Sequence, residues 1–132
     1  FWVELYIDPA RAPVVNEAWY MLCNPAWPNP NCYGGTWRVQ QTLAPGESIT
    51  LSSQALVADT AYSRWPGYFA QSGERRIYAL ADSYAEGAAR GAIVETNEQN
   101  NTADTVVVVG GIGLVEQSGQ ILTQEIAPLQ TR

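Results

Sequence analysis

The fold class is decided by the segment Ala-Asp-Thr-Val-Val-Val-Val, which spans Ala103–Val109. β-Branched residues favour strands because they pack well on a pleated surface. A run of consecutive valines is typical of a strand covered on both faces, so we expect Ala103–Val109 to lie in the centre of a sheet. The preceding segment Thr96–Thr102 is polar and rich in Asn, which predicts a turn. The sequence therefore predicts a buried strand that follows a tight polar turn.

Shorter segments with strand character recur along the rest of the chain. Apolar alternation and bounding turn residues predict five further strands: Phe1–Ile7, Thr36–Gln40, Ser48–Ser52, Arg75–Ser83 and Gly91–Glu95. We expect Ile49 and Leu51 to face the core. In the fourth strand, Ile77, Ala79 and Ala81 share one face, and Tyr78 and Leu80 share the other.

Two long loops separate the predicted strands. Ala10–Gly35 is crowded with prolines, and Ala55–Ala70 is rich in aromatic residues. No helix longer than a turn or two is expected among so many breakers. Short strands at roughly 8 to 12 residue intervals, with turn residues between them, predict an all-β fold. We expect an immunoglobulin-like β-sandwich of about seven antiparallel strands with long aromatic and Pro-rich loops.

Composition bounds the class of protein and its partners. The chain has 132 residues, 46% hydrophobic and 15% charged, which suits one folded domain. Seven basic residues, all Arg, against thirteen acidic ones give a net charge of −6. This balance repels phosphate groups, so neither nucleic acid nor an anionic membrane surface is expected as a partner. The longest apolar run, Thr105–Val115, is too short and too rich in glycine for membrane insertion.

Two cysteines, Cys23 and Cys32, bracket a short loop. The chain has no His, so a structural zinc site lacks ligands. A local disulfide between Cys23 and Cys32 is the favoured interpretation, and two buried free thiols are the alternative. A disulfide implies an oxidising compartment, so we expect an extracellular or cell-surface location. The chain opens on Phe1 and not on Met, which leads us to expect a processed or excised chain.

Three segments carry a resemblance to a known family. After Asp82, the segment Gly91–Asn101 reads Gly-Ala-Ile-Val-Glu-Thr-Asn-Glu-Gln-Asn-Asn, and Leu43–Ser48 reads Leu-Ala-Pro-Gly-Glu-Ser. They resemble the C-terminal signature and the Leu-x-Pro-Gly-x-Ser turn of the CARDB family, the cell-adhesion-related domains found in bacteria. The segment Phe1–Asp8 is similar to an early central strand of that family.

The resemblance implies an immunoglobulin-like sandwich over residues 1–109. CARDB domains are regarded as adhesion or spacer modules of surface and secreted proteins, without catalysis, so the resemblance implies a non-catalytic adhesion or structural module of a prokaryotic surface protein. The family has two strands before the one that starts here at Phe1, so the domain is expected to lack its first edge. The alternative is that those two strands lie upstream of Phe1 in a longer protein.

The C-terminal tail, residues 110–132, extends beyond the usual end of the family. Within it, Gln120–Ile126 is predicted to form one further strand. Such a strand, from the same chain or from a neighbouring copy, would pair with the open edge by β-strand addition. A donor from a neighbour would build an extracellular filament or pilus. Other protein chains, copies of this chain among them, are thus the expected partners.

Two groups of residues offer candidate binding sites. Asp82, Glu95, Asn97 and Glu98 carry the hard oxygen ligands that calcium takes. The favoured interpretation is structural, because Asn and Glu side chains also stabilise tight connections by bonding their backbone, so no cofactor is expected. Trp27, Trp65 and Tyr68 are candidates for stacking on surface glycans, as in a carbohydrate-binding module. The favoured alternative is that these rings pack beneath the long loops.

Catalysis is not expected. The chain lacks His and Lys, and no nucleophile elbow, phosphate-binding loop or metal-ligand motif is present in the sequence. Paired carboxylates hydrolyse glycosides in some enzymes, but Glu95 and Glu98 belong to a turn that is better explained structurally. We therefore expect that this chain is not an enzyme.

Overall fold

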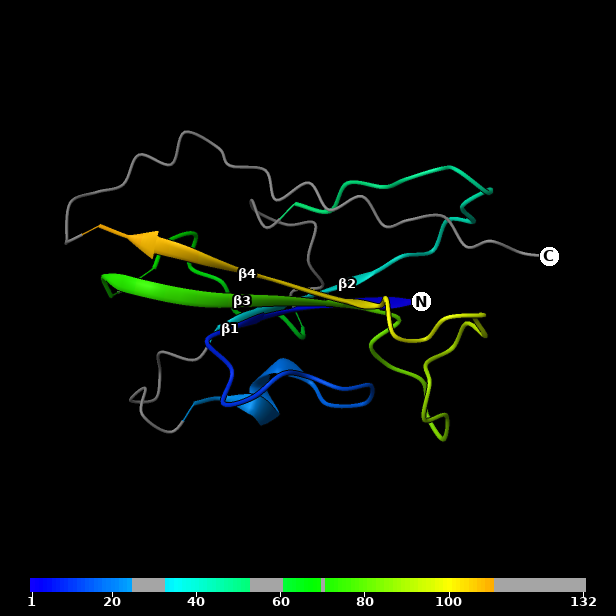
Figure 1. Ribbon diagram of the computed structural model, residues 1–132, viewed down its shortest axis with the longest axis horizontal. Coiled ribbons are helices and arrows are strands. Elements are labelled where there is room, and N and C mark those ends of the chain that lie inside the picture. The colour runs from blue at the N-terminus through cyan, green and yellow to red at the C-terminus, as the bar shows by residue number, and fades with distance from the viewer. Residues whose placement is uncertain (25–32, 53–60, 70, 111–132) are drawn as a thin grey trace.

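The computed structural model describes residues 1–24, 33–52, 61–69 and 71–110. These residues form one antiparallel sheet and a single turn of helix, in the order β1 (Trp2–Ile7), η1 (Trp19–Leu22), β2 (Gly34–Arg38), β3 (Gly73–Ala81) and β4 (Thr102–Val109). The strand order across the sheet is β2-β1-β3-β4 (Figure 1). The expectation of an all-β protein is thus confirmed.

Strand β1 lies inside the sheet and is buried along almost its whole length. Its residue Val3 is opposite Trp37 of β2 on one side and Ala81 of β3 on the other. Because successive side chains alternate between the faces of a sheet, the odd and even residues of β1 enter two different cores. The aromatic and β-branched N-terminal segment therefore contributes side chains to both cores.

The larger core lies on the face of the odd residues of β1. It consists of Val3, Leu5, Ile7, Trp37, Val39 and Ile77. Ile49 and Leu51 pack against it, as their alternation predicted, although Ser48–Ser52 is not a strand. The indole N–H of Trp37 donates to the carbonyl oxygen of Ser52 at 3.2 Å, so a side chain satisfies a backbone group that a strand partner would otherwise bond. In Figure 1 this segment lies on the opposite side of the sheet from η1.

The smaller core lies under η1. It consists of Tyr6, Trp19, Leu22 and Leu80, with Tyr78 half-buried beside it. Ile77 lies in the larger core and Leu80 in the smaller, so the faces predicted for the strand that is β3 are confirmed. Gly34 allows this packing, because a Cβ atom there would lie 2.3 Å from Cγ of Trp19 and 2.7 Å from the carbonyl oxygen of Leu5.

Besides Ser48–Ser52, other predictions about strands are wrong. Strand β4 lies at the edge of the sheet and is mostly exposed, where the valine run predicted a central position. Valine favours strands wherever they lie, so the run fixes the conformation without fixing the neighbours. Gly91–Glu95 is not a strand, because Asp82 binds the backbone N–H groups that a strand would use. Strand β3 also ends at Ala81, earlier than predicted, since Asp82 has a φ of 49°.

The expected sandwich of about seven strands stays a prediction, because the described ranges contain four strands in one sheet. The predicted tail strand Gln120–Ile126 lies outside the described residues. Within those ranges, no helix is long and apolar enough to cross a membrane.

Candidate functional site

The exposed side of β4 is the candidate interaction edge of this protein. Within the described residues β4 pairs with β3 alone. The N–H of Ala81 donates to the carbonyl oxygen of Asn101 at 2.8 Å, and antiparallel ladders alternate from such a pair. The odd residues Ala103–Val109 therefore bond β3. The backbone groups of the even residues point away from the sheet, and these are Thr102, Asp104, Val106 and Val108.

The opposite edge of the sheet is covered over most of its length. Gly34 of β2 exchanges two backbone hydrogen bonds with Arg64, one of 3.0 Å and one of 2.8 Å. The N–H of Thr36 donates to Oγ of Ser63 at 2.8 Å. The short segment around Ser63 and Arg64 thus takes the outward groups of Gly34 and Thr36. An edge strand with free backbone groups is a template for another strand, and among the described strands β4 has the longest such edge.

The side chains along the open edge divide into an apolar and a polar half. Val106 and Val108 are 44% and 77% exposed, whereas Val107 packs against the larger core from the other face. Towards the start of β4, Asp104 forms an ion pair of 2.8 Å with Arg76 of β3. Both side chains are about half-exposed, so this pair contributes little to stability. Its effect is to neutralise the only carboxylate on β4.

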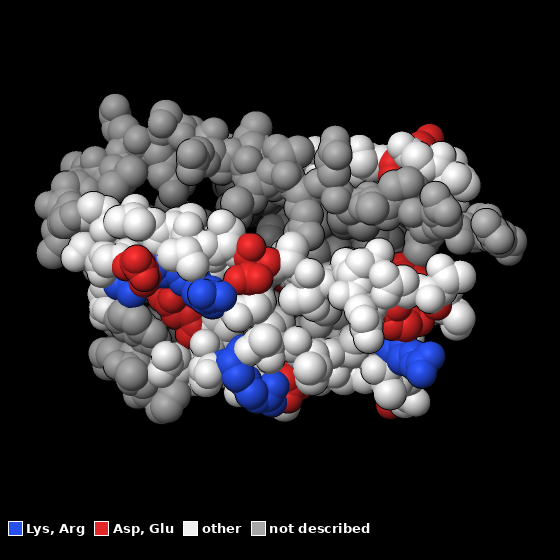
Figure 2. Space-filling view, viewed as in Figure 1, with Lys and Arg blue, Asp and Glu red and all other residues white. Residues whose placement is uncertain are grey.

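Surface charge is mixed on the face of the molecule that Figure 2 shows. Figure 2 shows the acidic and basic side chains in small groups that lie side by side, with uncharged surface between them. No extended patch of one sign is visible among the described residues on this face.

Asp82 organises the turn that leads towards β4. Its side chain is buried, with 2% of the residue exposed, and accepts hydrogen bonds from the N–H groups of Ala92 at 2.9 Å and Ile93 at 2.7 Å. Gly91 has a φ of +93°, and a Cβ there would lie 2.1 Å from Oδ2 of Asp82. Asp82 and Gly91 thus form one anchor for the connection.

The other acidic residues of this connection also bond its backbone. Oε1 of Glu98 accepts from the N–H of Glu95 at 3.1 Å, and Oδ1 of Asn97 accepts from the N–H of Gln99 at 3.0 Å. Burial raises the pKa of Glu95, and the nearby charges of Glu98 and Asp82 raise it further, while a hydrogen bond with Asn101 opposes the shift. These contacts are the ones that the structural interpretation expected.

The same carboxylates are the calcium candidates. No group of three or more acidic, His or Cys side chains in a metal-binding arrangement occurs within the described ranges. Asp82 directs both carboxylate oxygens at backbone N–H groups, so it is occupied without a cation. Calcium binding at Asp82, Glu95, Asn97 and Glu98, the less favoured interpretation of the sequence, stays untested.

The aromatic residues proposed for sugar stacking have different environments. Trp65 is half-buried and packs edge-to-face against Phe69 and Tyr33, with ring centroids 5.0 Å and 6.1 Å apart. Tyr68 is 59% exposed. Trp27 lies outside the described residues. Perpendicular, half-buried packing at Trp65 is the geometry of a small core beneath a loop and not of a flat stacking platform.

The predicted disulfide has one partner in the described part of the chain. Cys23 directly follows η1, and its backbone is bridged to Pro9. Cys32 lies outside the described residues. The Cys23–Cys32 bond therefore stays a prediction.

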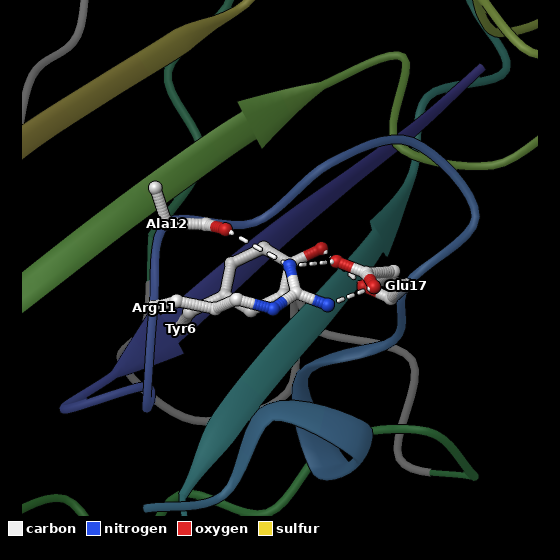
Figure 3. A network of polar contacts seen from close by, with 4 residues as sticks. All are labelled: Tyr6, Arg11, Ala12 and Glu17. Carbon is white, nitrogen blue, oxygen red and sulfur yellow. Dashed lines mark hydrogen bonds and ion pairs between the residues drawn. The ribbon is translucent and has the colours of Figure 1, made fainter.

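A buried polar network joins the loop before η1 to the centre of the sheet. The hydroxyl oxygen of Tyr6 lies within hydrogen-bonding distance of two acceptors, 2.6 Å from Oε2 of Glu4 and 2.7 Å from the carbonyl oxygen of Glu17. Arg11 in turn bonds both carboxylate oxygens of Glu17 (Figure 3). The hydrogen bond from Arg11, aided by its charge, holds the pKa of Glu17 below its usual value.

The carboxyl at the centre of this network is Glu4. Burial raises its pKa, although hydrogen bonds from Tyr6 and Thr36 oppose the shift. Only 7% of Glu4 is exposed, and Tyr6 is 1% exposed. The contacts of Glu4 and Tyr6 therefore connect the loop before η1 to the sheet.

From the sequence, an open edge was expected at the missing first strands and not at β4. The residues of β4 were assigned to the sheet centre, and Ser63 and Arg64, which cover part of the other edge, were placed in a loop rich in aromatic residues. One sequence signal was available. Thr102 and Asp104 are two positions apart and both polar, so they indicate a solvent-facing side on which Val106 and Val108 must also lie.

Comparisons with protein-family models, with curated proteins and with solved structures returned no match.

Proposed function

We propose that this chain is a non-catalytic adhesion or structural module of a prokaryotic surface protein, of the CARDB type. In this proposal the module binds other protein chains by adding an extended segment to β4. The resemblance of the Asp82 to Asn101 connection to the CARDB signature supports the class. The open edge supports the mode of binding.

The observation that carries the proposal is the contrast between the two edges. The outward groups of Gly34 and Thr36 on β2 are satisfied within the chain. Those of β4 have no partner strand among the described residues, although β4 is the more apolar strand. Natural sheets commonly block exposed edges with Lys, Pro or a covering loop. The chain has no Lys, and β4 has no Pro, so this edge lacks two of the common blocks.

A filament subunit is the second candidate function, and the same edge favours it. In that case the donor is Gln120–Ile126 of a neighbouring copy. A head-to-tail contact of this kind repeats without closing and builds a fibre. A carbohydrate-binding module is less well supported, because Trp65 is half-buried in a ring cluster.

Peptide titration tests the edge directly. Two synthetic probes are used, one copying residues 102–109 and one copying residues 120–126, each flanked by Arg for solubility. They are titrated into the isotope-labelled chain, and the backbone amide signals are followed. We expect shifts centred on Asp104, Val106 and Val108.

Val106→Pro is the matched test variant, because the N–H of Val106 points away from β3 and its loss spares the ladder. Binding should be lost in Val106→Pro and retained in Val106→Thr, which keeps the N–H and the branched shape. If neither peptide moves the outward amides of the wild-type chain at millimolar concentration, binding at the edge is wrong. A response to the second peptide alone favours the filament.

A further inference from the structure

We propose that the occupant of the open edge is a second copy of this chain, with β4 antiparallel to β4 around a two-fold axis. The two sheets then become one continuous sheet that crosses the dimer. This inference rests on the proposed function and names the partner that the edge selects.

The first argument is that, among the described residues, β4 offers the longest open edge of the sheet. On β2 the outward groups of Gly34 and Thr36 are occupied by Ser63 and Arg64 of the same chain. Pairing through β4 therefore covers the longest open edge in both copies. An interface that uses the same patch on both partners is closed by its symmetry, so association stops at two copies.

The second argument is that β4 is complementary to itself. An antiparallel, two-fold arrangement places a residue of β4 opposite its own copy or opposite a near neighbour. When Val106 faces Val106 of the second copy, Asp104 faces Val108, and all the outward backbone groups face one another. When Val107 is at the axis, Val106 faces Val108. Both registers bring together the exposed valines on one face of the sheet, which are 44% and 77% exposed in the single chain.

The third argument is electrostatic. Like charges directly opposite each other across two strands oppose pairing. The only charged residue on β4 is Asp104, and its carboxylate is already paired with Arg76 of the same chain at 2.8 Å. The edge therefore presents a neutral, β-branched strand to its copy. The overall charge of −6 resides elsewhere on the molecule.

Light scattering after size-exclusion chromatography tests the inference on the full chain, over a wide range of protein concentration. We expect the mass to rise from one copy to two and no further. Val108→Lys should abolish the dimer by placing two ammonium groups at the valine cluster. Val94→Lys is the matched control, because Val94 is 96% exposed outside the sheet and the change in charge is the same. It should leave the dimer intact.

Ile121→Pro separates the second copy from the tail as the occupant. Proline disables Gln120–Ile126 as a strand donor, so a dimer that persists in Ile121→Pro supports pairing of β4 with β4. Loss of the dimer in that variant overturns the inference in favour of the tail. A wild-type chain that stays monomeric at every concentration also overturns it. In that case binding of the peptide probes still decides the proposed function by itself.

Discussion

Replacing Asp82 by Ala should destabilise the protein more than any other single carboxylate substitution outside the cores. The carboxylate accepts two backbone hydrogen bonds and is almost wholly buried. Bonds to a charged acceptor contribute about 1.5–3 kcal/mol each. Ala92 is exposed and its N–H can bond water instead, so we expect a loss of about 3 kcal/mol in the free energy of unfolding. For a domain of this size that corresponds to a fall in Tm of about 12 °C.

Urea unfolding followed by tryptophan fluorescence measures the loss. Asp82→Asn retains a side chain that tolerates the φ of 49° and one acceptor oxygen, so it should lose about half as much as Asp82→Ala. Asp104→Ala, which removes an exposed ion pair, is the control and should cost no more than about 0.5 kcal/mol. If Asp82→Ala falls within the range of this control, the carboxylate does not anchor the connection.

A double-mutant cycle with Gly91 sharpens the test. Gly91→Ala places a Cβ against Oδ2 of Asp82 and also strains a backbone with a φ of +93°. Removal of the carboxylate relieves the first effect and leaves the second. Gly91→Ala should therefore cost less in the Asp82→Ala background than in the wild type. Additive losses would contradict the close contact between the two residues.

Three further predictions concern the cores and the predicted Cys23–Cys32 disulfide. Gly34→Ala should lower the free energy of unfolding by about 3 kcal/mol, because the added Cβ displaces Trp19 and breaks its 2.6 Å hydrogen bond to the carbonyl oxygen of Tyr62. A loss below about 0.5 kcal/mol in urea unfolding would contradict this packing. Burial raises the pKa of Glu4 above 4.5, so wild-type stability from this group is present below that pH and is lost as pH rises through the raised pKa. Relative to the wild type, Glu4→Gln should therefore be more stable near pH 7 than near pH 4, and an equal difference at both pH values would refute this. Reduction of a Cys23–Cys32 bond should lower the free energy of unfolding by about 2–3 kcal/mol, and a chain whose stability ignores a reducing agent has no such bond.

Strands were predictable where local pattern alone decides the conformation. The aromatic and branched residues of Trp2–Ile7 form β1, and the alternation in Gly73–Ala81 places Ile77 and Leu80 in opposite cores, as expected. Period-two alternation is a property of the strand itself and needs no knowledge of its neighbours. The same reasoning correctly turned Ile49 and Leu51 inward, although the segment lacks strand pairing.

The position of a strand within the sheet was not predictable in this way. Strand β4 was assigned to the centre because its valines suit burial, yet long-range pairing places it at the edge. The pattern of Gly91–Glu95 predicts a strand, but the N–H of Ala92 donates instead to Asp82, ten residues earlier in the chain. Contacts between distant residues override local propensity at both places.

The candidate site was hidden for the same reason. An open edge is defined by what fails to pair with it, and that depends on the whole sheet. The closing contacts of Ser63 with Thr36 and of Arg64 with Gly34 join segments that are far apart in sequence. Polar residues of this kind carry no motif. In contrast, Asp82, which anchors the connection before β4, belongs to the segment in which the sequence analysis saw a family resemblance.

Amide hydrogen exchange along β4 tests the central claim most directly. In a dilute sample, the outward amides of Asp104, Val106 and Val108 should exchange at least about tenfold faster than the inward amides of Thr105 and Val107. In a concentrated sample the outward amides should become protected, because a second strand then accepts their hydrogen bonds. Outward amides that are as slow as their inward neighbours at high dilution would show an edge already paired within one chain, and would contradict the account.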